Sequence, residues 1–140
     1  MKLRNPGSVQ PAPHLEGPAG ELAGMVAGWP GVASFTHWRL GSPGVVDGAE
    51  FHVGDPELGH IHLDGSAHIP LTGRIAALLE HKGLGRTPYW SDAWITCPVR
   101  SSVEVARASW MFQLSYARIR GASDAEVVDR IRSGAGLAAD

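Results

Sequence analysis

The sequence predicts an α+β domain, with an antiparallel sheet of about four strands and helices packed on one face. Two observations support this prediction. Short segments rich in β-branched and aromatic residues follow one another through tight turns, which is typical of antiparallel strands. Other stretches carry apolar residues at helical spacing behind a capping residue. The 140 residues, 44% of them hydrophobic, are enough for one domain with a buried core and too few for two.

The chain is expected to consist of a tail, one domain and a frayed end. Residues 1–18 are rich in proline, glycine and polar residues, and we predict that they form a disordered N-terminal tail. A single domain should occupy residues 19–134, and residues 135–140 should fray. The domain begins with a helix, because four apolar residues fall at the i, i+3, i+4 and i+7 positions of one helical face. They are Leu22, Met25, Val26 and Trp29.

Four segments are predicted to be strands because they are rich in β-branched and aromatic residues. They cover residues 32–40, 49–53, 58–63 and 93–99. The sequence GSPG predicts a turn between the first two, and the short GDPE connection makes the second and third a hairpin. A further turn is expected at the Asp-Gly pair that follows.

Capping residues mark three further helices. Thr72 is the expected N-cap of the first, which Gly83 should end. Ser101 and Ser123 open the other two, each followed three residues later by a glutamate in a capping box. The long helix that Ser101 opens, over about 102–120, carries apolar residues on more than one side, so it is expected to be largely buried.

Composition and motif content exclude several classes of protein. The formal charge of −2 provides no basic field to attract nucleic acid or an anionic membrane, and no apolar stretch has the length of a membrane span. Cys97 is the single cysteine, so no internal disulfide can form, and its expected role is packing in the core. The sequence contains no GxSxG, GxGxxG, P-loop or CxxC motif. We therefore expect a cytoplasmic protein whose partner is a small molecule, with no nucleic acid and no membrane.

The segment GDPELGHIHLDGSAHIP, residues 54–70, contains three of the seven histidines of the chain. In a strand, His60 and His62 point to the same side. A three-residue hairpin loop over 54–56 would pair Glu50 of the preceding strand with His60. Burial should select this register, since a shift by one residue would turn every apolar side chain of the strand toward water. One face of the sheet would then gather Glu50, His52, His60 and His62.

This cluster has several interpretations. The spacing Gly-x5-His-x-His opens the metal motif of cupins, but the glutamate that should follow is missing. HIHLD resembles the opening of metallo-β-lactamase-like hydrolases, but Gly65 stands where those enzymes need a histidine. A three-ligand metal site completed by Glu50 or His68 also stays open. So do two hypotheses without metal: a histidine that removes a proton from a bound molecule, and plain polar residues on a wet sheet face.

Aromatic residues near the last predicted strand favour a ligand site. Trp90 and Tyr89, beside the sequence SDAW, are placed to cover an aromatic ligand, and Trp94 lies in the strand itself. Most of the five tryptophans are nevertheless expected to be core residues.

Four segments stand out when the chain is considered as a whole. In order they are WPGV, EFHVGDPELGHIHLDG, HIPL and DAWITCPVRSSVEVARASWMFQLSYARI. Together they resemble the luciferase-domain family, small bacterial proteins related to the luciferases of bioluminescent fungi. The resemblance covers residues 29–119. Its most specific parts are His60 and His62, Trp94, and the pair Ser115 and Tyr116.

The resemblance implies an oxygenase. Fungal luciferase adds O₂ to a hydroxylated styrylpyrone without metal or flavin, so the family implies no cofactor and no metal. His60 and His62 would act as base and orienter in deprotonating an enol, with Glu50 tuning them. The expected substrate-binding residues are His52, Asp64, His68, Tyr89, Trp90 and Trp94. The rival hypotheses are a non-enzymatic binding or interaction module and a histidine-ligated metal protein.

Overall fold

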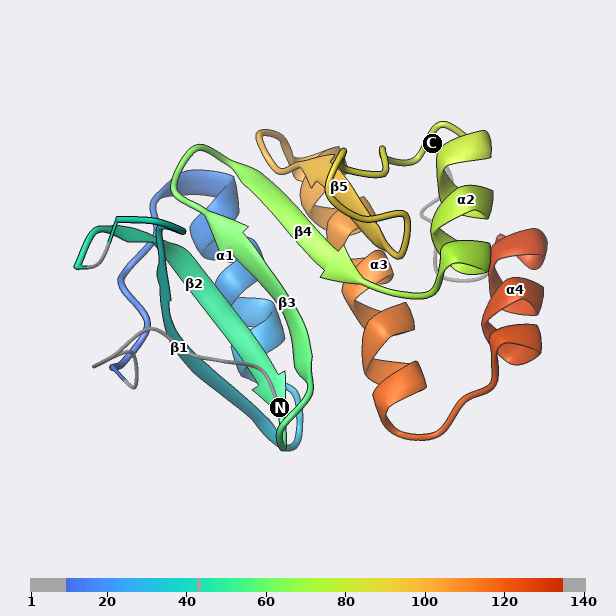
Figure 1. Cartoon of the computed structure of the whole chain (residues 1–140), viewed down its shortest axis with the longest axis horizontal. Coiled ribbons are helices and arrows are strands. Elements are labelled where there is room, and N and C mark those ends of the chain that lie inside the picture. Colours follow the sequence, from blue (N-terminus) through green and yellow to red (C-terminus); the bar gives the residue numbers. More distant parts are fainter. Residues whose placement is uncertain (1–9, 43, 135–140) are drawn as a thin grey trace.

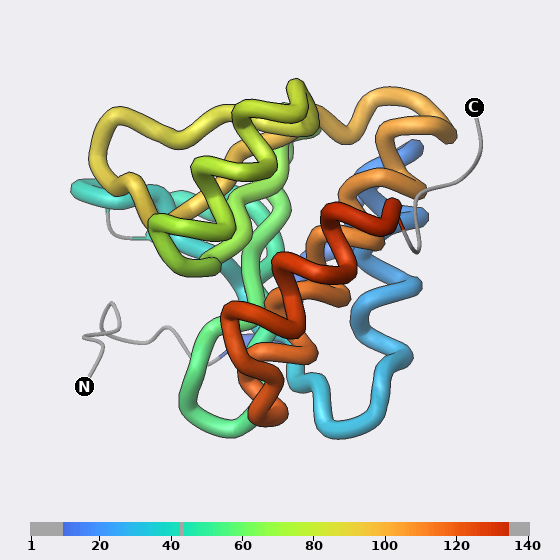
Figure 2. Tube along the Cα trace, turned by 90° about the vertical axis from the view of Figure 1, so that its right-hand side faces the viewer, coloured from blue at the N-terminus to red at the C-terminus, as the bar shows by residue number. Residues whose placement is uncertain are grey.

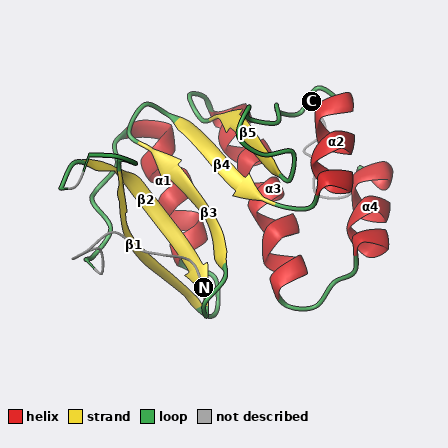
Figure 3. Cartoon of the chain, viewed as in Figure 1, coloured by secondary structure: helices red, strands yellow, loops and turns green. Residues whose placement is uncertain are grey.

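The computed structural model of the chain describes residues 10–42 and 44–134, which form five strands and four helices (Figure 1). The strands lie in one antiparallel sheet, so the predicted α+β class is confirmed (Figure 3). In chain order the elements are α1 (Gly17–Ala27), β1 (Val32–Trp38), β2 (Val46–Val53), β3 (Glu57–His62), β4 (Ser66–Pro70), α2 (Gly73–His81), β5 (Trp94–Pro98), α3 (Ser102–Ile119) and α4 (Asp124–Ser133).

The sheet is a meander in which each strand pairs with the next in sequence, in the order β1-β2-β3-β4-β5. Helices α1 and α3 pack together on one face, α1 against β1 to β3 and α3 against β3 to β5 (Figure 1). Helices α2 and α4 pack against each other beyond β5. The segment between α2 and β5 extends on the other side of the sheet from α1 and α3 (Figure 2). The second face of the sheet is thus available for a site.

The predicted helix caps are present. The side chains of Thr72, Ser101 and Ser123 each accept a hydrogen bond from the backbone N–H three residues later. Glu126 completes the capping box of α4, whereas Glu104 accepts from the backbone N–H of Arg100 instead of closing a box at α3. The boundaries of α2, α3 and α4 therefore follow from local sequence, as expected.

The sheet has one strand more than the predicted four. β4 spans only five residues, Ser66–Pro70, a stretch in which the sequence predicts only a connection between the third strand and the next helix. Serine, histidine and proline are weak strand formers, so the local signal is poor. Antiparallel pairing with β3 on one side and β5 on the other makes it a central strand.

The predicted disordered tail is too long at its C-terminal end. The Thr36 backbone N–H donates to the Gln10 carbonyl (2.9 Å) and its hydroxyl to the Pro11 carbonyl (2.7 Å), so these residues lie along β1. Leu15 is part of the core, and α1 begins at Gly17. The rest of the predicted tail, residues 1–9, and the predicted frayed end, 135–140, lie outside the described residues.

The predicted hairpin register between β2 and β3 is confirmed. The loop is the three-residue stretch 54–56, and Glu50 pairs with His60. Phe51 pairs with Gly59 on the opposite side. Phe51 is consequently buried in the core against α3, where its ring meets that of Phe112 edge-on at 6.1 Å. The polar partners lie on the face away from the helices.

A β-bulge interrupts this hairpin near its loop. His52 pairs with Glu57, so that Leu58 is the extra residue on β3. Gly59 has φ +152°, and a Cβ added there would lie 2.5 Å from Cε1 of Phe112. The buried Ser115 hydroxyl of α3 donates to the Leu58 carbonyl (3.0 Å). Contacts from α3 therefore stabilise the bulge, and only glycine fits at position 59.

We predict that Gly59→Ala destabilises the protein by about 3 kcal/mol, because the new methyl group meets Phe112 and the backbone leaves its favoured region. Urea denaturation measures the loss. Gly24→Ala is the matched control: Gly24 is exposed within α1 with open space around its Cα, so alanine should leave stability unchanged or raise it. Equal stability of the two variants would contradict this account of the bulge.

Candidate functional site

Four histidine rings meet on the face of the sheet opposite α1 and α3. We call His37, His60, His62 and His68 the histidine cluster. His37 and His60 are stacked at 3.9 Å with 12° between their planes. The His62 ring lies 4.9 Å from that of His60 and 4.6 Å from that of His68. The sheet thus collects onto one small patch rings that come from β1, β3 and β4.

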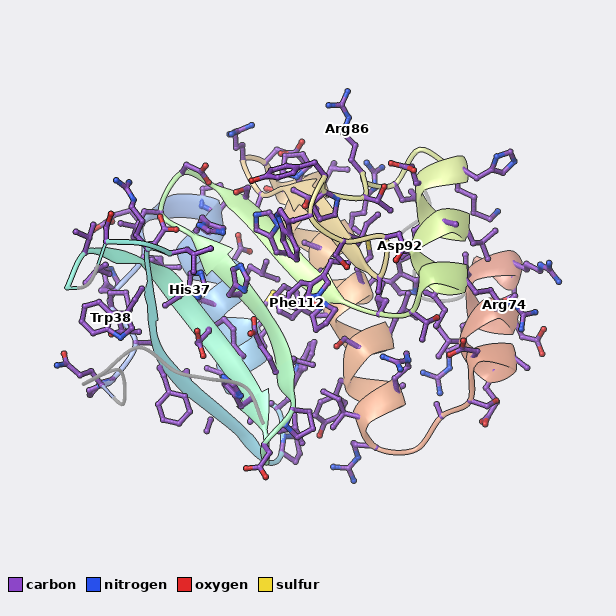
Figure 4. The ribbon with its side chains drawn as sticks, in the orientation of Figure 1. His37, Trp38, Arg74, Arg86, Asp92 and Phe112 are labelled. Atoms are coloured by element: carbon purple, nitrogen blue, oxygen red, sulfur yellow. The ribbon has the colours of Figure 1, made fainter. Side chains whose placement is uncertain are left out.

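Strand register brings these rings together. His60 pairs with Glu50 on one side and with His68 on the other, so β3 and β4 place their histidines side by side. His37 pairs with Gly48, which in turn pairs with His62. Strands two apart are separated by roughly 10 Å, yet the His37 and His62 rings lie 5.2 Å apart. They can approach across β2 because Gly48 has no side chain, and a Cβ there would collide with the Ile61 carbonyl. Figure 4 labels His37 over this part of the sheet.

Each ring of the cluster is oriented through its Nδ1 atom. The four contacts are His37 to Glu50 (2.9 Å), His60 to Glu57 (2.6 Å), His62 to Asp47 (2.8 Å) and His68 to the Thr96 hydroxyl (2.9 Å). A carboxylate can only accept, so three of the rings donate their Nδ1 proton. The nitrogen left for chemistry on these rings is Nε2.

Burial and mutual repulsion set the charge of the cluster. Burial lowers the pKa of His60, the charges of His37 and His62 lower it further, and the Glu57 carboxylate opposes the change without reversing it. Burial and the charges of His60 and His62 lower the pKa of His68 to about 4. At neutral pH the rings of His60 and His68 are therefore uncharged.

Glu50 behaves in the opposite way. Its burial disfavours the carboxylate, but hydrogen bonds from His37 and His52 more than offset this and hold the pKa of Glu50 far below its ordinary value. Its two oxygens are both used, one by His37 at 2.9 Å and one by His52 Nε2 at 2.7 Å. Glu50 is therefore an ionised support that joins two rings.

Two indole rings border the cluster. The Trp94 ring lies 5.7 Å from that of His60, and the Trp90 ring lies 6.0 Å from that of His68. The indoles meet each other at 5.3 Å with 61° between their planes. Trp90 is half exposed and belongs to the segment that extends over this side of the sheet (Figure 2). A planar ligand that reaches the histidines from this side would meet aromatic surface.

The structure groups most of the residues predicted for the site. It brings His60, His62 and His68 together with Trp90 and Trp94. Glu50 is predicted from the sequence to adjust the basicity of His60 and His62, and the structure does not place it in hydrogen-bonding contact with these two rings. Its partners are His37 and His52.

Three other predicted site residues have structural roles or lie outside the cluster. His52 is buried, with Nε2 bonded to Glu50 and Nδ1 to the Asp55 carbonyl (3.2 Å). Asp64 accepts hydrogen bonds from the backbone and side chain of Ser66 and so shapes the β3–β4 turn. Tyr89 is fully exposed, and among the described residues it makes no ring contact with the cluster.

His37, Asp47 and Glu57 belong to the site although the sequence patterns did not predict them. In β2, Gly48 lies on the same polar face as Glu50, two residues away. Extending the pairing from β2 back to β1 places His37 opposite Gly48, and this signal could have identified His37. Glu57 carries no such signal. It precedes His60 by three residues, so a regular strand would put the two on opposite faces, and only the bulge reverses this.

A cavity of about 670 Å³ lies at the β5 edge of the sheet. Ser66, Thr96 and Pro98 line it from the sheet, together with Arg100 and Arg107. The histidine rings are not part of its lining, but Thr96 joins the two regions because its hydroxyl holds His68. Arg86, on the same edge, also lines this cavity, and its side chain extends outward (Figure 4).

Three residues that could suggest other chemistry are structural. Cys97 is a buried residue of β5, and burial raises the pKa of its thiol to about 12. Ser115 donates to the Leu58 carbonyl, and the Tyr116 hydroxyl donates to the Pro30 carbonyl (2.6 Å). The Ser-Tyr pair of the family resemblance thus anchors α3 to the bulge and to the loop after α1.

Comparison with known proteins adds one finding. The family model described as Luciferase domain matches residues 55–135, a stretch that contains His60, His62 and His68 and leaves His37 before it. No curated protein and no solved structure matches the chain. In residues 10–42 and 44–134, none of the helices has the length and apolar character needed to cross a bilayer.

We predict that Cys97 in the folded protein does not react with iodoacetamide at pH 8, because a thiol whose pKa is raised stays protonated below that pKa and this one is also shielded. In guanidinium chloride the same residue should be alkylated fully. Mass spectrometry counts the modified chains in both samples. Rapid alkylation of the native protein would contradict the burial of the Cys97 thiol.

Proposed function

The chain belongs to the Luciferase domain family, and on this premise we propose that it binds a small planar molecule, enolic or aromatic, at the histidine cluster and acts on it as an oxygenase. The observation that carries the proposal is the arrangement of the four imidazoles. Three have a carboxylate on Nδ1 and the fourth a hydroxyl, and two of them, His60 and His68, lie beside indole rings. Structural histidines on a wet sheet face need no such set of supports.

The first step of the proposed reaction is the loss of a proton from the substrate. An uncharged imidazole that donates Nδ1–H to a carboxylate offers the lone pair of Nε2 as a base. His60 fits this role, since Glu57 at 2.6 Å stabilises the imidazolium as it forms. His62, held by Asp47, would orient the substrate oxygen. The enolate formed beside the new imidazolium supplies a second favourable charge interaction.

The second step needs only dioxygen. An enolate carries negative charge on carbon, and that carbon can give electrons to O₂: the new C–O bond forms as the O–O double bond becomes a single bond, and the resulting peroxide takes back the proton from the His60 imidazolium. The substrate is the reductant and O₂ the oxidant, so the step requires no redox group from the protein. The indoles of Trp90 and Trp94 would hold the planar part of the substrate by ring contacts.

We also propose a class of partner and a cellular location for the protein. A formal charge of −2 offers little attraction for nucleic acid or an anionic membrane, which supports a small-molecule partner. A single buried cysteine supports a reducing location, and we propose the cytoplasm.

The test uses a hydroxylated styrylpyrone as probe and measures oxygen uptake with an electrode. We expect His60→Ala and His62→Ala each to lower the rate by about 10²-fold or more, the usual contribution of a positioned general base. His81→Ala, on the exposed end of α2, is the control and should retain the full rate. Equal rates in all four proteins would rule out catalysis by the cluster. Binding of the probe without oxygen uptake would favour the non-enzymatic binding module.

The indole contacts have a separate test. Trp94→Leu should weaken binding of the same styrylpyrone about tenfold, because it removes an aromatic contact worth roughly 1 kcal/mol and part of the apolar surface. Tyr89→Ala, which removes a fully exposed aromatic side chain of the neighbouring loop, should leave affinity unchanged. Fluorescence titration gives both dissociation constants. A larger effect at Tyr89 than at Trp94 would place the ligand outside the cluster.

A further inference from the structure

We propose that His37, His60 and His62 form a binding site for one divalent transition-metal ion, of which Zn²⁺ is the type example. Each of the three offers one ring nitrogen, and these nitrogens lie within 4.8 Å of one another. The inference goes beyond the proposed function, which needs no metal, and it stands whether or not that function holds.

The donor set selects the class of ion. Imidazole nitrogens suit zinc, copper, iron and nickel, whereas calcium and magnesium prefer oxygen ligands. Metal-bound histidines usually donate their other N–H to a carboxylate or a carbonyl, which fixes the ring and makes the ligating nitrogen more basic. Here each of the three rings has such a carboxylate on Nδ1, within 2.6 to 2.9 Å. The three carboxylates, Glu50, Glu57 and Asp47, would also offset the charge of a bound dication.

The Nε2 atoms provide the second argument. Among the described residues nothing is hydrogen-bonded to Nε2 of His37, His60 or His62. Three partly buried rings thus each keep one nitrogen without a hydrogen bond to the described part of the chain, and one ring nitrogen from each lies within 4.8 Å of the others. One shared cation would satisfy all three, which a single hydrogen-bond donor could not do.

The rings must close slightly around an ion. With Zn–N bonds of about 2.0–2.1 Å, two ligands of a tetrahedral ion lie roughly 3.3 Å apart, so the nitrogens would move together by up to about 1.5 Å. The stacked pair His37 and His60 must also tilt, because a metal lies in the plane of each imidazole that binds it. The His60 side chain is 9% exposed and held by Glu57, whereas the His37 and His62 side chains are each 18% exposed. His60 is therefore the fixed ligand, and the other two close on it.

A neighbouring set of residues does not form a second site. Glu50, His52 and Glu57 also place one donor atom each within 4.8 Å. Both nitrogens of His52 are already bonded, to Glu50 and to the Asp55 carbonyl. The two glutamates are the supports of His37 and His60. This set therefore serves as the outer layer of the first.

An occupied site would have one open position. Three protein ligands and a free fourth position are typical of catalytic zinc. An oxygen of a ligand held beside Trp94 could take that position, where the ion would stabilise negative charge.

The test measures metal binding to the full chain, without any substrate. Protein stripped with a chelator is titrated with ZnCl₂ in competition with a chromogenic chelator, and with CoCl₂ while the visible spectrum is recorded. We expect one ion per chain, with a cobalt spectrum of tetrahedral type. His37→Ala and His62→Ala should each weaken binding at least 100-fold, and Glu57→Gln about 10- to 100-fold, the usual effect of losing the carboxylate behind a ligand. His81→Ala should bind as the parent does.

Circular dichroism checks that each variant folds, and the more exposed His37 and His62 carry the test because His60 is buried with its partner. Failure of Zn²⁺, Co²⁺ and Ni²⁺ to bind with one-to-one stoichiometry would overturn the proposal. So would unchanged affinity in His37→Ala and His62→Ala. Oxygen uptake by the stripped protein with styrylpyrone separates this outcome from the proposed function: activity without metal binding removes only the metal site, and metal binding without activity removes only the oxygenase.

Discussion

The bulge at Leu58 and Gly59 is the constraint on which the site depends. It turns Glu57 to the same face as His60, where the two form a 2.6 Å hydrogen bond. In an unbulged strand Glu57 would face the core, where a buried carboxylate without a partner is costly. The bulge in turn exists because Ser115 of α3 binds the Leu58 carbonyl and because Gly59 leaves room for Phe112. Packing on the helical face thus determines the chemistry of the opposite face.

The polar face behaves as one electrostatic unit. Every ring of the histidine cluster has its own support, and Glu50 serves two histidines at once. The ionised Glu50 and the uncharged rings of His60 and His68 coexist there, because burial and repulsion from neighbouring imidazoles lower the pKa of both histidines while hydrogen bonds from His37 and His52 lower the pKa of Glu50. Such a network is expensive to assemble in a small domain, since buried ionic groups seldom add net stability. Its cost points to a role in binding or catalysis.

The proposed oxygenase and the proposed metal site are two uses of the same geometry. Both need the Nε2 atoms of the cluster to be presented together, and both place a planar ligand beside Trp90 and Trp94. They differ in what takes up the negative charge of the ionised substrate: an imidazolium supported by Glu57 in one case, a cation held by three rings in the other. The same strands, register and bulge support both proposals.

Much of the fold and part of the site follow from the sequence alone. Capping residues determine where α2, α3 and α4 begin, and the parity of the β2–β3 loop determines that Glu50 faces His60, because these are local rules of side-chain spacing and backbone hydrogen bonding. Only the tertiary structure decided the rest. β4 became a strand through neighbours on both sides, His37 reached the cluster across Gly48, and Glu57 reached His60 through a bulge held by α3. These features depend on contacts between residues far apart in the chain, whose packing no local pattern encodes.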